Sequence, residues 1–292
     1  MSDVTQTAET FHAGYPVQAA YTRRGPYAVT AGTVTDGTGD VIYDLYYPDD
    51  YAALGFQSPV VTWGNGTDAT PAMYSTLLRH LASYGFTVIA STLANTGSGN
   101  QIAAAARYLA SQATTAGSVF DGNLDTEHVA AVGHSQGAGG ATRAATDDPE
   151  LITTLMTFSL PDTIWVGPNP DCPTKADCMY NPALLTQPVF FISTHGLEDL
   201  IIASPETETA FYQSTTTQAA LGIIQDSGGM PADHNSIQNV ASGGNPRGEL
   251  GYATAWLAYQ LRGDTMAAGA FTGPYPELTA NLNWPGSAAK SS

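Results

Sequence analysis

An apolar run breaks into glycines around a single serine. Residues 129–132 can form a buried strand, and residues 138–145 can begin a helix. Between them, Gly133, Ser135 and Gly137 match the Gly-x-Ser-x-Gly pattern of a nucleophile elbow, a sharp strand-to-helix turn that exposes a serine hydroxyl. A side chain at either glycine would collide with neighbouring chain in so strained a turn. The stretch predicts that Ser135 is a nucleophile.

Two other interpretations of this turn stay open. It can be a glycine-rich turn that only packs tightly, or one that cradles a phosphate group. No lysine follows the glycines and the spacing of a dinucleotide-binding loop is absent, which disfavours the phosphate interpretation. The strand before the motif and the helix after it favour the nucleophile.

A serine hydroxyl needs a histidine to accept its proton and a carboxylate to orient that histidine. In folds with this elbow, both follow the serine along the chain, in the order acid then histidine, on loops after later strands. Asp199 follows the apolar run 188–193, and His234 lies in a loop after the run 220–225. We predict Asp199 as the acid and His234 as the base, with the adjacent Glu198 as the competing acid.

The other histidines fit the role of base less well. His80 lies inside a predicted helix, and His128 begins the predicted elbow strand. His134 should point away from the serine next to it. His195 is expected to be structural, and His12 belongs to an N-terminal segment of uncertain order.

The tetrahedral intermediate of such a reaction needs donors for its oxyanion, and removing one costs roughly 2.7–4 kcal/mol. The first should be the backbone N–H of Gln136. The second should come from the backbone of Asn65, in the glycine-rich loop after the run 59–63, where we also expect Gly64 to contact substrate. A simple turn is the alternative for this loop. Asn65 also begins an Asn-x-Thr glycosylation sequence, which we discount because a glycan would block the site.

The remaining pattern alternates strands with helices. Strands are expected at 27–34, 40–47, 59–63, 86–90, 127–133, 155–160, 188–193 and 220–225. Helices are expected at 73–84, 101–113, 138–145, 206–217 and 248–261. The first two strands should pair as an antiparallel edge, and the rest should form right-handed crossovers. We predict an α/β fold, with a mostly parallel sheet flanked by helices on both faces and a loop excursion at 162–182.

Composition limits the partners. The 292 residues include 26 Asp or Glu and nine Lys or Arg, a formal net charge of −17 that should repel nucleic acid and anionic membranes. No apolar stretch is long enough to span a bilayer, and residues 1–6 lack a signal-peptide pattern. We expect an N-terminal segment of uncertain order at 1–20, one domain at 21–285 and a flexible tail at 286–292.

The chain has two cysteines, Cys172 and Cys178. Their spacing can close a short disulfide loop, which favours an oxidising compartment, and two unpaired thiols are the alternative. Without neighbouring histidines they make a poor zinc site. We expect a disulfide, no metal, and a secreted protein whose signal peptide has been removed.

Most of the chain resembles the α/β-hydrolases of the bacterial cutinase and polyester-hydrolase group, which are related to dienelactone hydrolases. The resemblance rests on the elbow 133–140 and on Arg24-Gly25-Pro26-Tyr27, Ala82-Ser83-Tyr84-Gly85-Phe86 and Ala255-Trp256-Leu257. It implies hydrolysis of polyesters and short-chain esters in a shallow groove without a lid. It also implies an aromatic wall beside the nucleophile, for which Trp165 is the candidate.

Four differences from that group weaken the polymer inference. Gln136 stands where the group usually carries methionine, and Asn65 where an aromatic residue usually lines the groove. The excursion at 162–182 is longer, and the group's paired cysteines near the C-terminus are missing. The catalytic inference is unaffected.

We predict a serine hydrolase that cleaves carboxylic esters through an acyl-enzyme, without metal or organic cofactor. The substrate is expected to be an ester, in the sharper form an insoluble polyester, and the protein a monomer. A carboxylesterase or lipase-like enzyme acting on small soluble esters is the alternative, which the polar Gln136 and Asn65 would suit. A hydrolase-fold binding protein is the non-enzyme alternative, although such a protein need not keep nucleophile, acid and base in order.

Overall fold

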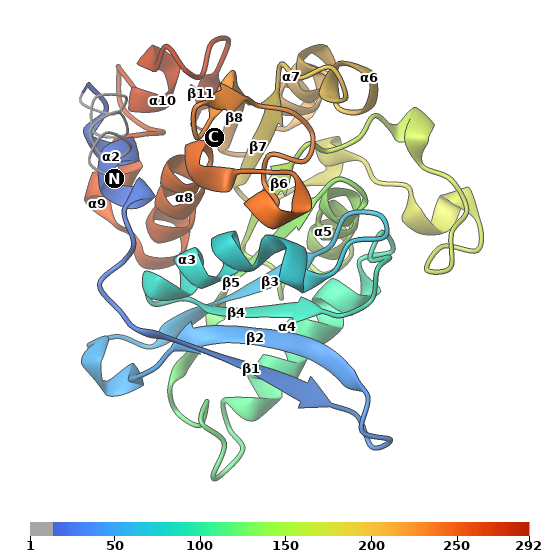
Figure 1. The fold of residues 1–292 in the computed structure, drawn as a ribbon, viewed down its shortest axis with the longest axis vertical. Coiled ribbons are helices and arrows are strands. Elements are labelled where there is room, and N and C mark those ends of the chain that lie inside the picture. Colours follow the sequence, from blue (N-terminus) through green and yellow to red (C-terminus); the bar gives the residue numbers. More distant parts are fainter. Residues whose placement is uncertain (1–13, 292) are drawn as a thin grey trace.

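The computed structural model describes residues 14–291 and is built on a nine-stranded sheet (Figure 1). In spatial order the strands are β1 (Val29–Thr35), β2 (Val41–Pro48), β4 (Thr87–Ser91), β3 (Ser58–Gly64), β5 (Leu124–His134), β6 (Thr154–Phe158), β7 (Val189–Thr194), β8 (Ala219–Ile224) and β11 (Ala288–Lys290). The six strands from β4 to β8 in this order are parallel, whereas β1, β2 and β11 are antiparallel to their neighbours. A two-residue pair, β9 (Asp226–Ser227) with β10 (Met230–Pro231), lies apart from this sheet.

Helices cover both faces of the sheet, so each central strand is apolar on both sides. The helices are α2 (Pro16–Thr22), α3 (Ser75–Ser83), α4 (Asn100–Gln112), α5 (Gln136–Asp147), α6 (Asp199–Ile202), α7 (Pro205–Ser214), α8 (Leu250–Arg262), α9 (Thr265–Ala268) and α10 (Glu277–Ala280). Along β3, Val61 and Trp63 pack into one core with α3 and α8, and Val60 packs into the other with α4 and α5. The arrangement confirms the predicted α/β-hydrolase fold.

The loops that could carry chemistry gather at the carboxyl edge of the parallel strands. The longest follows β6 and contains three short 3-10 helices, Thr163–Trp165, Lys175–Cys178 and Pro182–Leu184. It projects from the side of the molecule in Figure 1, where the predicted excursion at 162–182 is drawn in yellow-green. The expected disulfide between Cys172 and Cys178 closes a loop within it.

The N-terminal segment differs in part from the uncertain order expected for residues 1–20. Residues 1–13, including His12, lie outside the described residues. Helix α2 packs against α8, and the backbone N–H groups of Val17 and Gln18 donate to the Glu277 carboxylate at 2.7 and 2.8 Å. A distant carboxylate therefore orders the start of this helix.

The C-terminal segment differs from the flexible tail expected at 286–292. Residues 288–290 form β11 and extend the sheet beside β8, which is therefore not the last strand. The Lys290 ammonium donates to the carbonyls of Tyr212 and Thr215 at 2.7 and 2.6 Å, at the end of α7. Within residues 14–291, no helix is long and apolar enough to cross a membrane.

Candidate active site

The turn between β5 and α5 has the geometry of a nucleophile elbow. Ser135 occupies the left-handed region at φ 51° and ψ −124°, which a residue with a side chain rarely adopts. Its N–H donates to the Phe158 carbonyl of β6 at 2.9 Å, so the neighbouring strand holds the strained residue in place. The hydroxyl thereby stands at the end of the strand, half-buried, at the floor of a cavity.

The glycines of the elbow are required by close backbone contacts. A Cβ on Gly133 would lie 2.2 Å from the Gly137 carbonyl oxygen, and a Cβ on Gly137 would lie 2.3 Å from the Gly64 carbonyl. Gly64 is itself buried, and a Cβ there would lie 2.6 Å from the Ile102 side chain. Gly64 therefore lets β3 approach the elbow. It is not among the residues that line the cavity, and its predicted contact with substrate stays a prediction.

Three predicted site residues meet in one hydrogen-bonded chain. His234 Nε2 lies 3.0 Å from Ser135 Oγ, and His234 Nδ1 lies 2.7 Å from Asp199 Oδ1. Because the carboxylate accepts, the imidazole carries its proton on Nδ1 and leaves Nε2 free to accept from the serine hydroxyl. Asp199 and His234 are buried, so these contacts are shielded from water.

Hydrogen bonds to its second oxygen, Oδ2, fix the Asp199 carboxylate in place. The hydroxyls of Ser159 and Thr194 donate to Oδ2 at 2.9 and 2.8 Å, and the Thr194 N–H donates at 3.1 Å. Ser159 also lies in the left-handed region, at φ 49°, which places its hydroxyl against the acid. These donors fix the orientation of Oδ1 toward His234.

Glu198, the competing acid, points elsewhere. Its side chain is exposed and accepts from the Asn235 amide at 3.2 Å, while its backbone N–H donates to Asp233 at 3.0 Å. His195 is exposed as well. The geometry brings Asp199 to the imidazole of His234 and leaves Glu198 away from it.

His134 does not contact the reacting atoms but supports the segment that carries the base. Its Nε2 donates to the carbonyl of His234 at 2.9 Å, so its Nδ1 accepts from the Tyr74 hydroxyl, 3.0 Å away. Complete burial holds the pKa of His134 well below its usual value, which keeps the ring neutral. The Gly66 N–H in turn donates to Tyr74, which links the loop after β3 to His234.

The two predicted oxyanion residues occupy different environments. Gln136 is the first residue of α5 and lines the cavity, and a backbone N–H in this position has no acceptor within its helix. The Asn65 side chain is fully buried, and its amide donates to the carbonyls of Ser91 and Leu93 at 2.7 and 3.0 Å. From this loop, Thr67 rather than the Asn65 side chain reaches the cavity.

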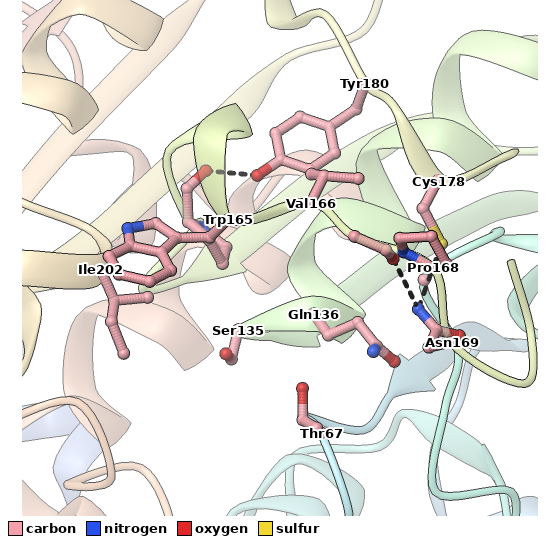
Figure 2. Close-up of a pocket in the computed structure, with 13 residues that line it drawn as sticks. Thr67, Ser135, Gln136, Trp165, Val166, Pro168, Asn169, Cys178, Tyr180 and Ile202 are labelled. Carbon is pink, nitrogen blue, oxygen red and sulfur yellow. Dashed lines mark hydrogen bonds between the residues drawn. The ribbon is translucent and has the colours of Figure 1, made fainter. Parts of the chain in front are cut away.

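A cavity of about 320 Å³ opens above Ser135. It is lined by Thr67, Gly97, Ser135, Gln136, Pro161, Trp165, Val166, Gly167, Pro168, Asn169, Cys178, Tyr180 and Ile202. Figure 2 shows Trp165 and Ile202 on one side of the serine, with Pro168, Asn169 and Cys178 on the other. Trp165 is half exposed, and its indole N–H donates to the Ile201 carbonyl at 2.9 Å, which holds the ring at the cavity edge.

A buried carboxyl group lies beneath the loop that carries His234. The Ser227 hydroxyl is within hydrogen-bonding distance of the Asn245 carbonyl, the Gly248 N–H and the Glu249 carboxyl. The Ser227 hydroxyl accepts from the Gly248 N–H, and its single proton lies between two acceptors, the Asn245 carbonyl and the Glu249 carboxyl. Burial, the largest cause, raises the pKa of Glu249 to about 7.

Glu249→Gln is expected to make folding stability less dependent on pH. The folded protein holds an extra proton between about pH 4.5 and 7, so wild type loses stability as the pH rises through this window, in total on the order of 3 kcal/mol. Glutamine stays neutral throughout. We expect the Tm of the variant to rise relative to wild type between about pH 5 and 8, while Glu150→Gln, at an exposed position, should not change the difference. If the Tm difference between Glu249→Gln and wild type did not change with pH, the raised pKa of Glu249 would be contradicted.

Sequence reasoning missed several side chains of this site, namely Thr67, Tyr74, Ser159 and Thr194. Thr67 ends the glycine-rich loop 64–67 and Thr194 directly follows the predicted strand 188–193, so their positions at the carboxyl edge are a usable signal. Tyr74 lies within the predicted helix 73–84, which gives it no functional signal, and nothing local to Ser159 indicates its backbone conformation.

A family model described as PET hydrolase-like matches residues 6–267. Three cutinases are each 31% identical over 138 residues, 44% of this chain: Cutinase 2 of Thermobifida cellulosilytica, Cutinase est2 of Thermobifida alba and Cutinase cut1 of Thermobifida fusca. The match covers 49%, 43% and 40% of these proteins, so the chain spans less than half the length of the curated relatives it matches.

Proposed function

The chain belongs to the PET hydrolase-like family, and we propose that it is a serine hydrolase that cleaves carboxylic esters through an acyl-enzyme. The observation that carries this proposal is the hydrogen-bonded chain from Ser135 through His234 to Asp199, with contacts of 3.0 and 2.7 Å. The order of the three groups and the strained serine at the start of α5 support it further.

In the first half-reaction, Ser135 Oγ attacks the ester carbonyl carbon while His234 Nε2 takes the hydroxyl proton. Collapse of the tetrahedral intermediate breaks the bond to the alcohol oxygen, and the alcohol leaves with the proton from His234. The acyl group stays on Ser135. Water then attacks this ester, His234 takes a proton from the water and returns it to Ser135, and the acid is released.

We place the oxyanion between the start of α5 and the loop after β3. The backbone N–H of Gln136 is the first donor, supported by its position at a helix N-terminus. The backbone of Asn65 remains our prediction for the second donor, with Thr67 beside it at the cavity. No metal or organic cofactor enters these steps.

For the substrate, we propose an ester with an apolar acyl part, in the sharper form a polyester. Apolar side chains beside the cavity are exposed: Ile164, Trp165, Leu200 and Ile201. An apolar rim of this kind suits adsorption to a hydrophobic polymer surface. The names of the matched relatives, which are cutinases, support the same class. The disulfide supports an exported protein.

The test is hydrolysis of an amorphous polyester film beside a soluble p-nitrophenyl ester, with Ser135→Ala as the blank. Soluble product from the film that disappears in the variant is the expected result. Hydrolysis confined to the soluble ester would favour the carboxylesterase alternative, which the polar side chain of Gln136 at the cavity suits. Binding of either ester without turnover would favour a binding protein.

A further inference from the structure

We propose that the segment 166–180, which we call the strap, forms the end wall of the cavity on its acyl side and so sets the length of the longest acyl group that the enzyme accepts. Asp171 is the residue that positions the strap. This inference rests on the proposed ester hydrolase function. The strap is closed on itself by the Cys172–Cys178 disulfide.

The cavity lies on the acyl side of the reacting ester. His234 must return its proton to the alcohol oxygen, so the alcohol has to lie next to the loop 226–245. No residue that lines the cavity belongs to the loop 226–245. The lining comes from the loops after β3 and β4, the elbow, the strap, Pro161 and Trp165 before the strap, and Ile202. The space above Ser135 therefore runs away from His234 and receives the acyl group.

The strap meets the loop after β4 at the far end of this space. Cys178 and Gly97 both line the cavity, and a Cβ on Gly97 would lie 2.7 Å from the sulfur of Cys178. The two segments are thus in contact at this end of the cavity. Figure 2 shows Pro168, Asn169 and Cys178 together at this end, beyond the side chain of Gln136.

Asp171 ties the strap to the start of α4. Its Oδ2 accepts from the Ser98 N–H at 2.7 Å, and its Oδ1 accepts from the Ser98 hydroxyl at 3.0 Å and from the Gln101 amide at 2.6 Å. Three donors on one carboxylate form a strong, directional clamp. The carboxylate itself does not line the cavity, so it acts through the position of the strap.

The loop on the opposite side of the contact is fixed independently. The Gln136 side chain accepts from the Thr96 N–H at 3.1 Å and donates to Asn95 at 3.2 Å. Arg143 of α5 holds the other arm of the strap, donating to the carbonyls of Ala176 and Met179 at 3.2 and 2.9 Å. Loss of the Asp171 clamp should therefore free the arm at 166–171 and open the end of the cavity.

The experiment measures kcat/KM for p-nitrophenyl esters whose acyl chains run from two to sixteen carbons, with the alcohol held constant. Wild type should hydrolyse short chains and decline steeply along the series. In Asp171→Ala the ratio of the decanoate to the butanoate value should rise by about tenfold or more, since a few methylenes in an apolar pocket are worth at least that factor. Asp171→Asn, which faces three donors with only one acceptor oxygen, should change the ratio in the same direction.

Asp177→Ala is the matched control in the same strap, because among the described residues its carboxylate accepts hydrogen bonds from Thr174, which also belongs to the strap. Its ratio should stay within about twofold of wild type. Gly167→Leu tests the opposite direction: Gly167 lines the cavity and a Cβ there meets no atom within 4 Å, so a larger side chain should lower the ratio.

An unchanged ratio in Asp171→Ala and Gly167→Leu, or a wild type that cleaves long and short chains equally well, would overturn the role of the strap. If Asp171→Ala does not fold, the ratios measured for Asp171→Asn and Gly167→Leu test the role of the strap in its place. Absence of hydrolysis that depends on Ser135 would instead overturn the proposed function, so the two failures are distinguishable.

Discussion

Ser135→Ala is expected to lower kcat for ester hydrolysis by about a million-fold, to the residual rate that a donor-lined cavity gives without a nucleophile. The variant has no Oγ to attack the carbonyl carbon, and His234, 3.0 Å away, then has no hydroxyl to deprotonate. Direct attack by water is the remaining route. The measurement is the initial rate with a p-nitrophenyl ester, at enzyme concentrations high enough to detect the residual activity.

The control is whether the elbow survives the change. The backbone of Ser135 is held by the Phe158 carbonyl, and alanine retains the N–H that makes this bond, so the Tm should move by only a few degrees. A substrate that still binds the variant, detected by thermal stabilisation, would show that the cavity is intact. Equal rates in wild type and variant would contradict the assignment of the nucleophile.

The order of functional groups could be predicted from the sequence because it follows from local patterns. The apolar runs, the glycines around Ser135 and the loops after two later strands are each visible within a dozen residues. The collision at Gly133, with the Gly137 carbonyl, follows from the same local geometry, whereas the collision at Gly137 is with Gly64 of the distant strand β3. Such features depend on backbone sterics and strand position, which the chain determines locally.

Features that depend on contacts between distant segments could not be predicted. Whether Asn65 or Thr67 faces the cavity depends on where Ser91 and Leu93, at the end of β4, offer carbonyls to the asparagine amide. The strand at 288–290 forms because β8 presents an open edge, although its residues look like a flexible tail. The docking of Asp171 on Ser98 joins residues 73 positions apart.

Asp199→Asn is expected to lower kcat by about ten-thousand-fold while the protein stays folded. Three donors, from Ser159 and Thr194, converge on Oδ2 of the acid. An asparagine must turn its carbonyl oxygen toward these donors, so its NH₂ group faces His234 Nδ1. The imidazole then accepts at Nδ1 and carries its proton on Nε2, where it can no longer accept from Ser135. The rate loss therefore comes from the wrong tautomer and not from a lost charge alone.

Glu198→Gln is the matched control for this prediction, because the two carboxylates are adjacent in sequence and only one reaches the imidazole. Glu198 is exposed and contacts the Asn235 amide, a bond that glutamine also makes, so kcat should change less than about twofold. Measuring kcat and KM for both variants separates the two acids. A larger loss in Glu198→Gln than in Asp199→Asn would mean that the loop rearranges when substrate binds, and that Glu198 takes the place of Asp199 at His234.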